Sequence, residues 1–198
     1  MTTRHPFTWM DIHVQKVAFW PLLVFALLMM AVQQSLGGPL ITAAAPSGIV
    51  SFELAGSLAG TQAMLESWGP AGRVYAGLSL GTDYVFLLAY SGAIALGCVL
   101  AARSFSRRGS WLAALGPVLA WAVLGAALLD AVENWALIQV LLGTQQAVWP
   151  ALARICAIPK FLIVGLGLLY VLLGAMTWLA VTVIRSRRRH APASRDSR

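Results

Sequence analysis

The chain has 198 residues, of which 59% are hydrophobic and only 11% are charged, and its formal net charge is +7. Soluble domains carry about a quarter of their residues as charged side chains, so this composition excludes an ordinary soluble globular protein. The basic residues flank long apolar segments and form no separate basic domain, which argues against binding to nucleic acid.

Four apolar segments are long enough to cross a bilayer, which takes about 20 residues per helix. Inside lipid every backbone amide needs an internal partner, so these segments are predicted to be helices. We predict an all-α fold in which a single domain, residues 1–184, is an integral membrane bundle of four transmembrane helices. A basic cytoplasmic tail, residues 185–198, follows it. The predicted spans cover residues 17–36, 82–102, 112–142 and 158–184.

The first span also has features of a signal peptide, because Lys16 precedes it and three alanines at 43–45 follow it. Those alanines lie well beyond the apolar core, and Pro46 would directly follow the cut. We therefore expect a retained signal-anchor helix; cleavage would leave a protein with three spans.

A long outer segment, residues 37–79, connects the first two spans. Thr61 is predicted to cap a short helix over residues 62–68, which the pair Gly69-Pro70 ends. The apolar stretch 49–54 is expected to lie on the membrane or across the bundle. We predict a short interfacial helix here, and both a lid over the outer mouth and a plain connector stay open.

The third apolar segment carries Asp130, Glu133 and Asn134 at spacing i, i+3 and i+4, which places them on one face of a helix. Ionisable groups in hydrocarbon are costly and rare. They mark a polar interior, an ion path or a buried ion pair. This motif is therefore the first place to look for a functional site.

Polar residues of the second and fourth spans fall at the same predicted depth, in the outer half of the membrane. Lys160 is expected to pair with Asp130 or Asp83, which leaves at least one carboxylate without a cation in its span. Such a group would be protonated, hydrogen-bonded to a tyrosine or amide, or bound to a ligand. The predicted ligand-binding residues are Asp83, Tyr84, Tyr90, Asp130, Glu133, Asn134 and Lys160.

Several kinds of chemistry lack a sequence signal. The three histidines lie outside the spans, and no Cys/His set has zinc spacing. There is no Gly-rich phosphate loop and no hydrolase serine motif. We predict no metal, no cofactor and no catalytic residue. A site for a hard cation made of oxygen ligands stays open, since Asp83, Asp130, Glu133 and Asn134 offer such ligands. Cys98 and Cys156 are expected at depths too different for a disulfide.

The distribution of basic residues predicts the orientation. Eleven of the fourteen fall on one side if the N-terminus is inside, which is the positive-inside pattern and places both termini in the cytoplasm of a bacterial inner (plasma) membrane. The basic residues of the tail are predicted to lie against anionic headgroups of the bilayer. The four that define this patch are Arg185, Arg187, Arg188 and Arg189.

These features lead to three hypotheses of function. The first is a site that binds or translocates a small solute, an ion or a lipid headgroup. The second is a structural or accessory subunit whose charges serve helix assembly or a partner protein. The third is an intramembrane acid–base enzyme that uses two carboxyl groups. The sequence leaves open whether the chain forms a homo-oligomer or binds another membrane protein.

Overall fold

The structure is a computed structural model. It describes the backbone of residues 4–106 and 111–189, and side chains in these ranges up to residue 183. Within the described ranges the secondary structure is entirely helical, without strands. In chain order the elements are α1 (Ile12–Gly37), the 3-10 helix η1 (Gly38–Leu40), α2 (Ile49–Leu54), α3 (Leu58–Ser106), α4 (Leu112–Leu141) and α5 (Val148–Arg189).

Four of these helices, α1, α3, α4 and α5, are long and apolar enough to cross a membrane. The predicted all-α architecture with four candidate spans is therefore confirmed at that level. The structure differs in the helix ends, because α3 and α5 begin well before the predicted starts at residues 82 and 158. The added turns of α3 contain small and polar residues that lower the hydropathy.

The first part of α3 is a separate short helix. Gly69 has φ 60° and ψ −169°, a backbone conformation that bends the chain between a helix ending at Trp68 and one beginning at Pro70. Residues 58–68 are helical, so this helix begins before the predicted residue 62 and Thr61 is not its cap; that it lies at the membrane interface stays a prediction. The Ser57 hydroxyl accepts a hydrogen bond from the backbone N–H of Gly60 at 3.2 Å, so Ser57 takes the capping role.

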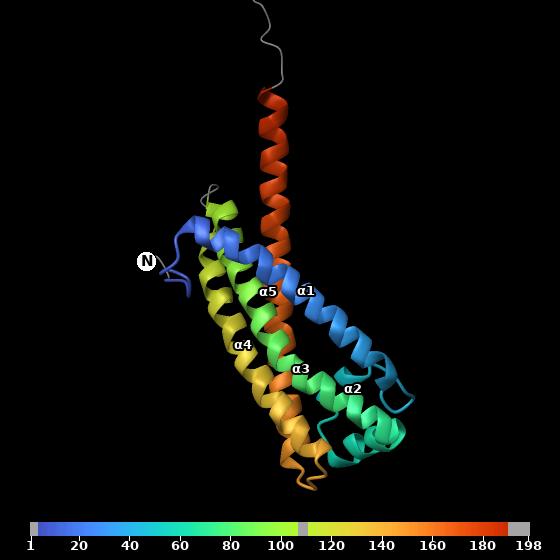
Figure 1. Cartoon of the computed structure of the whole chain (residues 1–198). Helices are drawn as coiled ribbons and strands as arrows, with labels where there is room; N and C mark the ends of the chain where they lie inside the picture. The colour runs from blue at the N-terminus through green and yellow to red at the C-terminus, as the bar shows by residue number, and fades with distance from the viewer. Residues whose placement is uncertain (1–3, 107–110, 190–198) are drawn as a thin grey trace, which may run out of the picture.

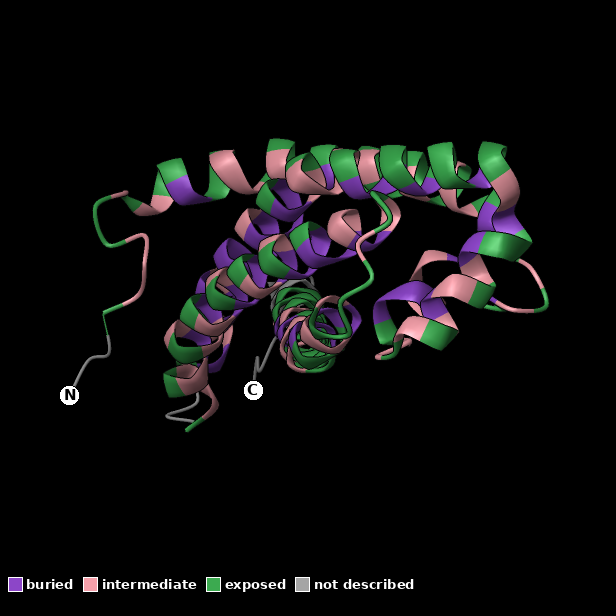
Figure 2. Ribbon diagram, turned by 90° about the horizontal axis from the view of Figure 1, so that it is seen from below, coloured by how far each residue is buried: buried purple, intermediate pink, exposed green. Residues whose placement is uncertain are grey.

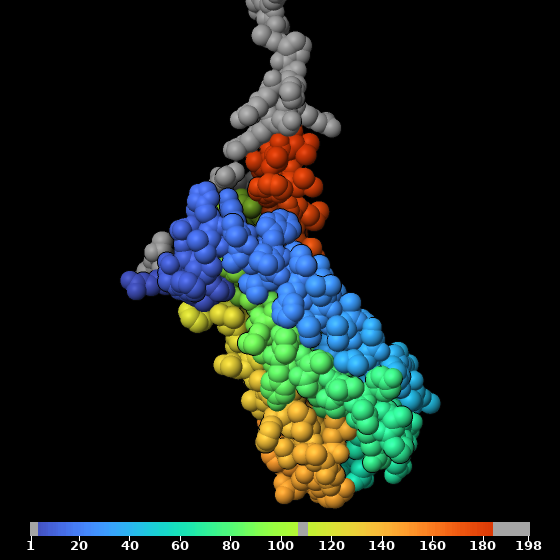
Figure 3. All heavy atoms as spheres, viewed as in Figure 1, coloured from blue at the N-terminus to red at the C-terminus, as the bar shows by residue number. Residues whose placement is uncertain are grey.

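The helices α3, α4 and α5 pack together, and α1 lies diagonally across the surface of α3 (Figures 1 and 3). Only two residues of α1 are buried, Gln15 and Ala26, whereas α3 and α4 carry most of the core. Figure 2 shows this contrast, with exposed residues along much of α1. We call the end of the bundle with η1, α2 and the α4–α5 turn the loop end, and the opposite end the terminal end.

Small residues allow the helices to approach closely, as is common in membrane bundles. A Cβ atom added at Gly167 of α5 would lie 2.9 Å from side-chain carbons of both Ile94 in α3 and Val123 in α4. The two cysteines, Cys98 and Cys156, are buried free thiols, so the prediction that they form no disulfide with each other is confirmed.

The segment between α1 and the long part of α3 folds onto the loop end of the bundle. Leu40 and Phe52 are fully buried there, and the Trp68 indole N–H donates to the Leu40 carbonyl at 2.8 Å. This second small core fixes α2 against α5 and α4. As a result, the one acid of α2, Glu53, points into the bundle.

Candidate functional site

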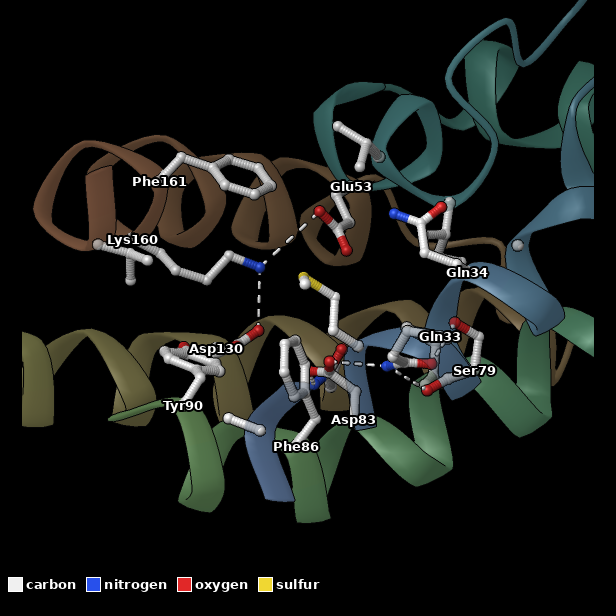
Figure 4. Close-up of a pocket in the computed structure, with 18 of the residues that line it drawn as sticks. Gln33, Gln34, Glu53, Ser79, Asp83, Phe86, Tyr90, Asp130, Lys160 and Phe161 are labelled. Atoms are coloured by element: carbon white, nitrogen blue, oxygen red, sulfur yellow. Dashed lines mark hydrogen bonds and ion pairs between the residues drawn. The ribbon is translucent and has the colours of Figure 1, made fainter. Parts of the chain in front are cut away.

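A group of polar side chains, most of them buried, lies in the loop-end half of the bundle (Figure 4); Gln33 and Asp83 are half-buried. Every helix contributes to it, from α1 through α5. We call it the polar cluster, and its members are Gln33, Glu53, Asp83, Tyr90, Asp130, Glu133, Asn134 and Lys160.

One half of the polar cluster is organised around Lys160 of α5. Its Nζ atom lies 2.9 Å from Asp130 Oδ1 and 2.9 Å from Glu133 Oε2, both on α4. The second oxygen of Asp130 accepts a hydrogen bond from the Tyr90 hydroxyl at 2.7 Å. Because the Lys160, Asp130 and Glu133 side chains are at most 7% exposed, these are ion pairs shielded from water. Removing one partner of such a buried ion pair strongly destabilises the folded protein.

Glu53 reaches the same ammonium from α2. Its Oε2 atom lies 3.8 Å from Lys160 Nζ, and this oxygen accepts no hydrogen bond from the described residues. Burial raises the pKa of the Glu53 carboxyl to about 7, although the neighbouring ammonium opposes the shift. Glu53 is therefore poised between its neutral and charged forms near neutral pH.

The other half of the polar cluster surrounds Asp83 of α3. Its two oxygens accept hydrogen bonds from the Asn134 amide at 2.6 Å and from the Gln33 amide at 2.8 Å. The Gln33 amide oxygen in turn accepts from the hydroxyls of Ser79 and Thr82, each at 3.2 Å. These contacts satisfy hydrogen bonds without bringing a cation to the Asp83 carboxylate.

The structure brings most of the sequence-predicted residues together, including the expected pair of Lys160 with Asp130. Tyr84 is the exception. Its hydroxyl donates to the Ala131 carbonyl at 3.1 Å, so it joins α3 to α4 rather than contacting a carboxylate. Because successive helical residues are rotated by about 100°, Tyr84 cannot share the face of its neighbour Asp83. The role of the predicted set as ligand-binding residues stays a prediction.

The sequence analysis left Glu53 and Gln33 out of the candidate site. Glu53 stood in a segment without a predicted position in the bundle, and only its isolation among apolar neighbours marked it. Gln33 is near the end of the first span, where polar residues are common at the interface. The contact that reveals its role crosses from α1 to α3.

A cavity of about 650 Å³ adjoins the polar cluster. Its size is typical of sites that bind small molecules. Glu53, Asp83 and Asp130 line it, and Lys160 is the only basic side chain among the described residues that do so. Apolar residues make up most of the remaining wall, which they form from α1, α3 and α5; examples are Leu27, Phe86, Ile94, Val164 and Leu168.

The chemistry offered by this arrangement is recognition of positive charge. Three carboxyl groups of the polar cluster share the Lys160 ammonium and the fourth, Asp83, contacts only amides, so a cation that enters the cavity can gain charge-assisted hydrogen bonds. Among the described residues, no group of three or more His, Cys, Asp or Glu side chains has the arrangement of a metal site.

Comparison of the chain with protein-family models, with curated proteins and with solved structures finds no match.

Proposed function

We propose that this protein is an integral membrane protein that binds or translocates a small ligand at the polar cluster, and that the ligand carries a positive charge, as a small solute or as the headgroup of a lipid. The observation that carries the proposal is the 650 Å³ cavity whose polar wall contains three carboxyl groups and one amine. Buried acids in a membrane are costly, so a cavity lined by them is consistent with a ligand that compensates the charge.

Isothermal titration calorimetry on the purified protein in a neutral detergent tests this proposal. The probes are butylammonium, and neutral butanol as its uncharged counterpart. We expect butylammonium to bind and butanol to bind weakly or not at all. Loss of a charge-assisted hydrogen bond in Glu53→Gln or Asp83→Asn is expected to weaken butylammonium binding by about tenfold or more. Glu66→Gln is the matched control, because it removes one negative charge from an exposed residue outside the cavity.

Two results would contradict the proposal. One is the absence of butylammonium binding to the wild-type protein. The other is binding that is equal in Glu53→Gln, Asp83→Asn and the Glu66→Gln control, because the charge recognised would then lie elsewhere.

A structural role is the second candidate, and the Lys160 contacts favour it. This ammonium joins α5 to α4 through Asp130 and Glu133 and approaches Glu53 of α2. In this alternative the ion pairs fix the orientation of helices in the bundle or for a partner protein. It requires that the charges affect stability and that no cation bind in the cavity.

The membrane and the orientation belong to the same proposal. The positive-inside pattern supports a bacterial inner (plasma) membrane with both termini in the cytoplasm. Reporter fusions at residue 198 test this, with a cytoplasmic fluorescent protein expected to be active and a periplasmic phosphatase inactive. The four tail arginines lie at positions whose side chains fall outside the described part, and their contact with anionic headgroups stays a prediction.

A further inference from the structure

The cavity is divided along its length into a polar part and an apolar part. The carboxyl groups and Lys160 lie toward the loop end, and from there the wall continues toward the terminal end as apolar side chains of α1, α3 and α5. Along α5 the wall extends from Lys160 to Leu168, about 12 Å at the helical rise of 1.5 Å per residue. Along α1 it extends from Gln33 to Leu23, about 15 Å.

The apolar part lies between two helices that do not pack closely on each other. α1 packs on α3, and α5 packs on α3 and α4, but in the described structure α1 and α5 have at most slight contact. Residues on both sides of this gap line the cavity and are also exposed at the surface. They are Leu27 (51% exposed) and Met30 (45%) on α1, and Phe161 (40%) and Leu168 (47%) on α5.

The gap between α1 and α5 is a lateral opening toward lipid if these helices span the membrane as their composition indicates. The cavity has a second opening at the loop end, where Gln34 and Ser47 line the cavity and are exposed. A soluble cation would need only the loop-end opening. We call the apolar part of the cavity between α1 and α5 the apolar slot. A small soluble cation would leave this slot empty, whereas an alkyl chain would fill it.

We propose that the ligand of this cavity is a cationic amphiphile that enters from the bilayer between α1 and α5, with its amine at Glu53 and Asp83 and its alkyl chain in the apolar slot. This inference rests on the proposed function, since it names the class of ligand for the same site. The position of Glu53 supports this inference separately from the presence of several acids in the cluster. Glu53 is 8% exposed, lines the cavity and presents an oxygen without a hydrogen bond from the described residues.

The chain offers matched variants that separate the slot from the polar cluster. Leu168→Trp places a large side chain in the slot, whereas Leu169→Trp places the same side chain at a 53% exposed neighbour outside the cavity. On the other wall, Leu27→Trp and Leu28→Trp form the same pair, since Leu28 is 60% exposed and does not line the cavity. Having a pair on each helix keeps the test usable if one variant fails to fold.

The experiment is native mass spectrometry of the full chain in detergent, which counts bound molecules of dodecylamine, butylamine and dodecanol at equal concentrations. We expect dodecylamine to bind at a single site. Its occupancy should fall on the order of tenfold in Glu53→Gln or Asp83→Asn, the loss typical of a hydrogen bond to a charged group. Leu168→Trp and Leu27→Trp should lower dodecylamine occupancy comparably and leave butylamine unchanged, while the two control variants bind like wild type.

The possible results separate the two proposals. If butylamine binds, and dodecylamine binds equally to Leu168→Trp, Leu27→Trp and their controls, the amphiphile inference fails and the cation site stands. Binding of dodecanol as strong as that of dodecylamine would also overturn the inference, because the amine would then have no role. If neither amine binds to the wild-type protein, the proposed function itself fails.

Discussion

The two halves of the polar cluster hold their aspartates by different means. Asp130 contacts a buried ammonium at 2.9 Å and a phenol hydroxyl at 2.7 Å, whereas Asp83 contacts two side-chain amides at 2.6 and 2.8 Å. An ammonium neutralises the carboxylate and satisfies its hydrogen bonds; an amide does only the second. The Lys160 half is therefore suited to joining helices, and the Asp83 half to presenting negative charge to the cavity.

This difference leads to opposite expectations for substitutions that preserve shape and remove charge. At Lys160 and Asp130 they should destabilise the protein, because a buried partner loses its counterion. In the Asp83 half they should weaken cation binding with little loss of stability. Four measurements test this contrast, in order of decreasing effect on stability.

The largest effect is expected from Lys160→Met, which keeps the length of the side chain and removes the ammonium from Asp130 and Glu133. Removal of one partner of a buried ion pair costs about 3–5 kcal/mol in the free energy of unfolding. Unfolding by titration with sodium dodecyl sulfate measures it. The control is Arg154→Gln, which removes an exposed positive charge from the same helix. Equal stability of the two variants would show that the ion pairs do not hold the bundle together.

The next effect is a pH dependence caused by Glu53. Its pKa is about 7 in the folded protein against 4.5 as its ordinary value, so the folded state binds this proton more tightly than the unfolded chain. The free energy of unfolding should therefore fall as the pH rises from about 4.5 to about 7, by on the order of 3 kcal/mol. Glu53→Gln should flatten that slope, while Asp83, Asp130, Glu133 and Lys160, which surround Glu53, remain. An unchanged slope in Glu53→Gln would assign the pH dependence to another group.

A smaller loss is expected from Asp130→Asn. The ion pair with Lys160 is lost, but Glu133 still pairs with the ammonium, and the carbonyl oxygen of the introduced amide can accept from Tyr90. We expect a loss of about 1.5–3 kcal/mol, typical of hydrogen bonds to a charged group. Tyr90→Phe serves as a comparison that leaves the charges in place. If Asp130→Asn were more stable than wild type, the aspartate would be kept at a cost to the fold, which favours a ligand-binding role.

The smallest effect on stability is expected from Asp83→Asn, which retains one acceptor oxygen for the two amides and loses no counterion. A change within about 1 kcal/mol is expected, because the loss of one hydrogen bond is offset by the removal of a largely buried charge that has no counterion. The same variant is expected to weaken cation binding strongly. A protein that unfolds readily after Asp83→Asn would remove the distinction between the two halves.

The sequence predicted the four candidate spans and the polar face of α4, because both follow from the spacing of residues within one helix. The four apolar runs indicated the four candidate spans, and the i, i+3, i+4 spacing placed Asp130, Glu133 and Asn134 on one buried face. The scarcity of bases at that depth predicted that Lys160 pairs with Asp130 or Asp83, and the structure shows the pair with Asp130. The early start of α3 could not be read, because small and polar residues such as Arg73, Gly77 and Gly81 lower the hydropathy before residue 82.

Glu53 and Gln33 show what local patterns do not contain. Glu53 reaches Lys160 across more than one hundred residues of sequence, because η1 and α2 pack onto the loop end through Leu40 and Phe52. Gln33 bonds to Asp83 because α1 crosses α3 at that level. Both contacts depend on how whole helices are positioned. Periodicity within one helix carries no information about that.

The length of α5 has a consequence outside the polar cluster. Its 42 residues form a helix of about 63 Å, twice the ~30 Å thickness of bilayer hydrocarbon. Even at a 40° tilt it would extend about 48 Å along the membrane normal, so roughly 18 Å must lie beyond the hydrocarbon. At the terminal end α5 stands clear of the other helices (Figure 1). Its last turns therefore form a rigid spacer. If α5 spans the membrane as its composition indicates, the height of residue 189 above the bilayer depends on the tilt of this helix.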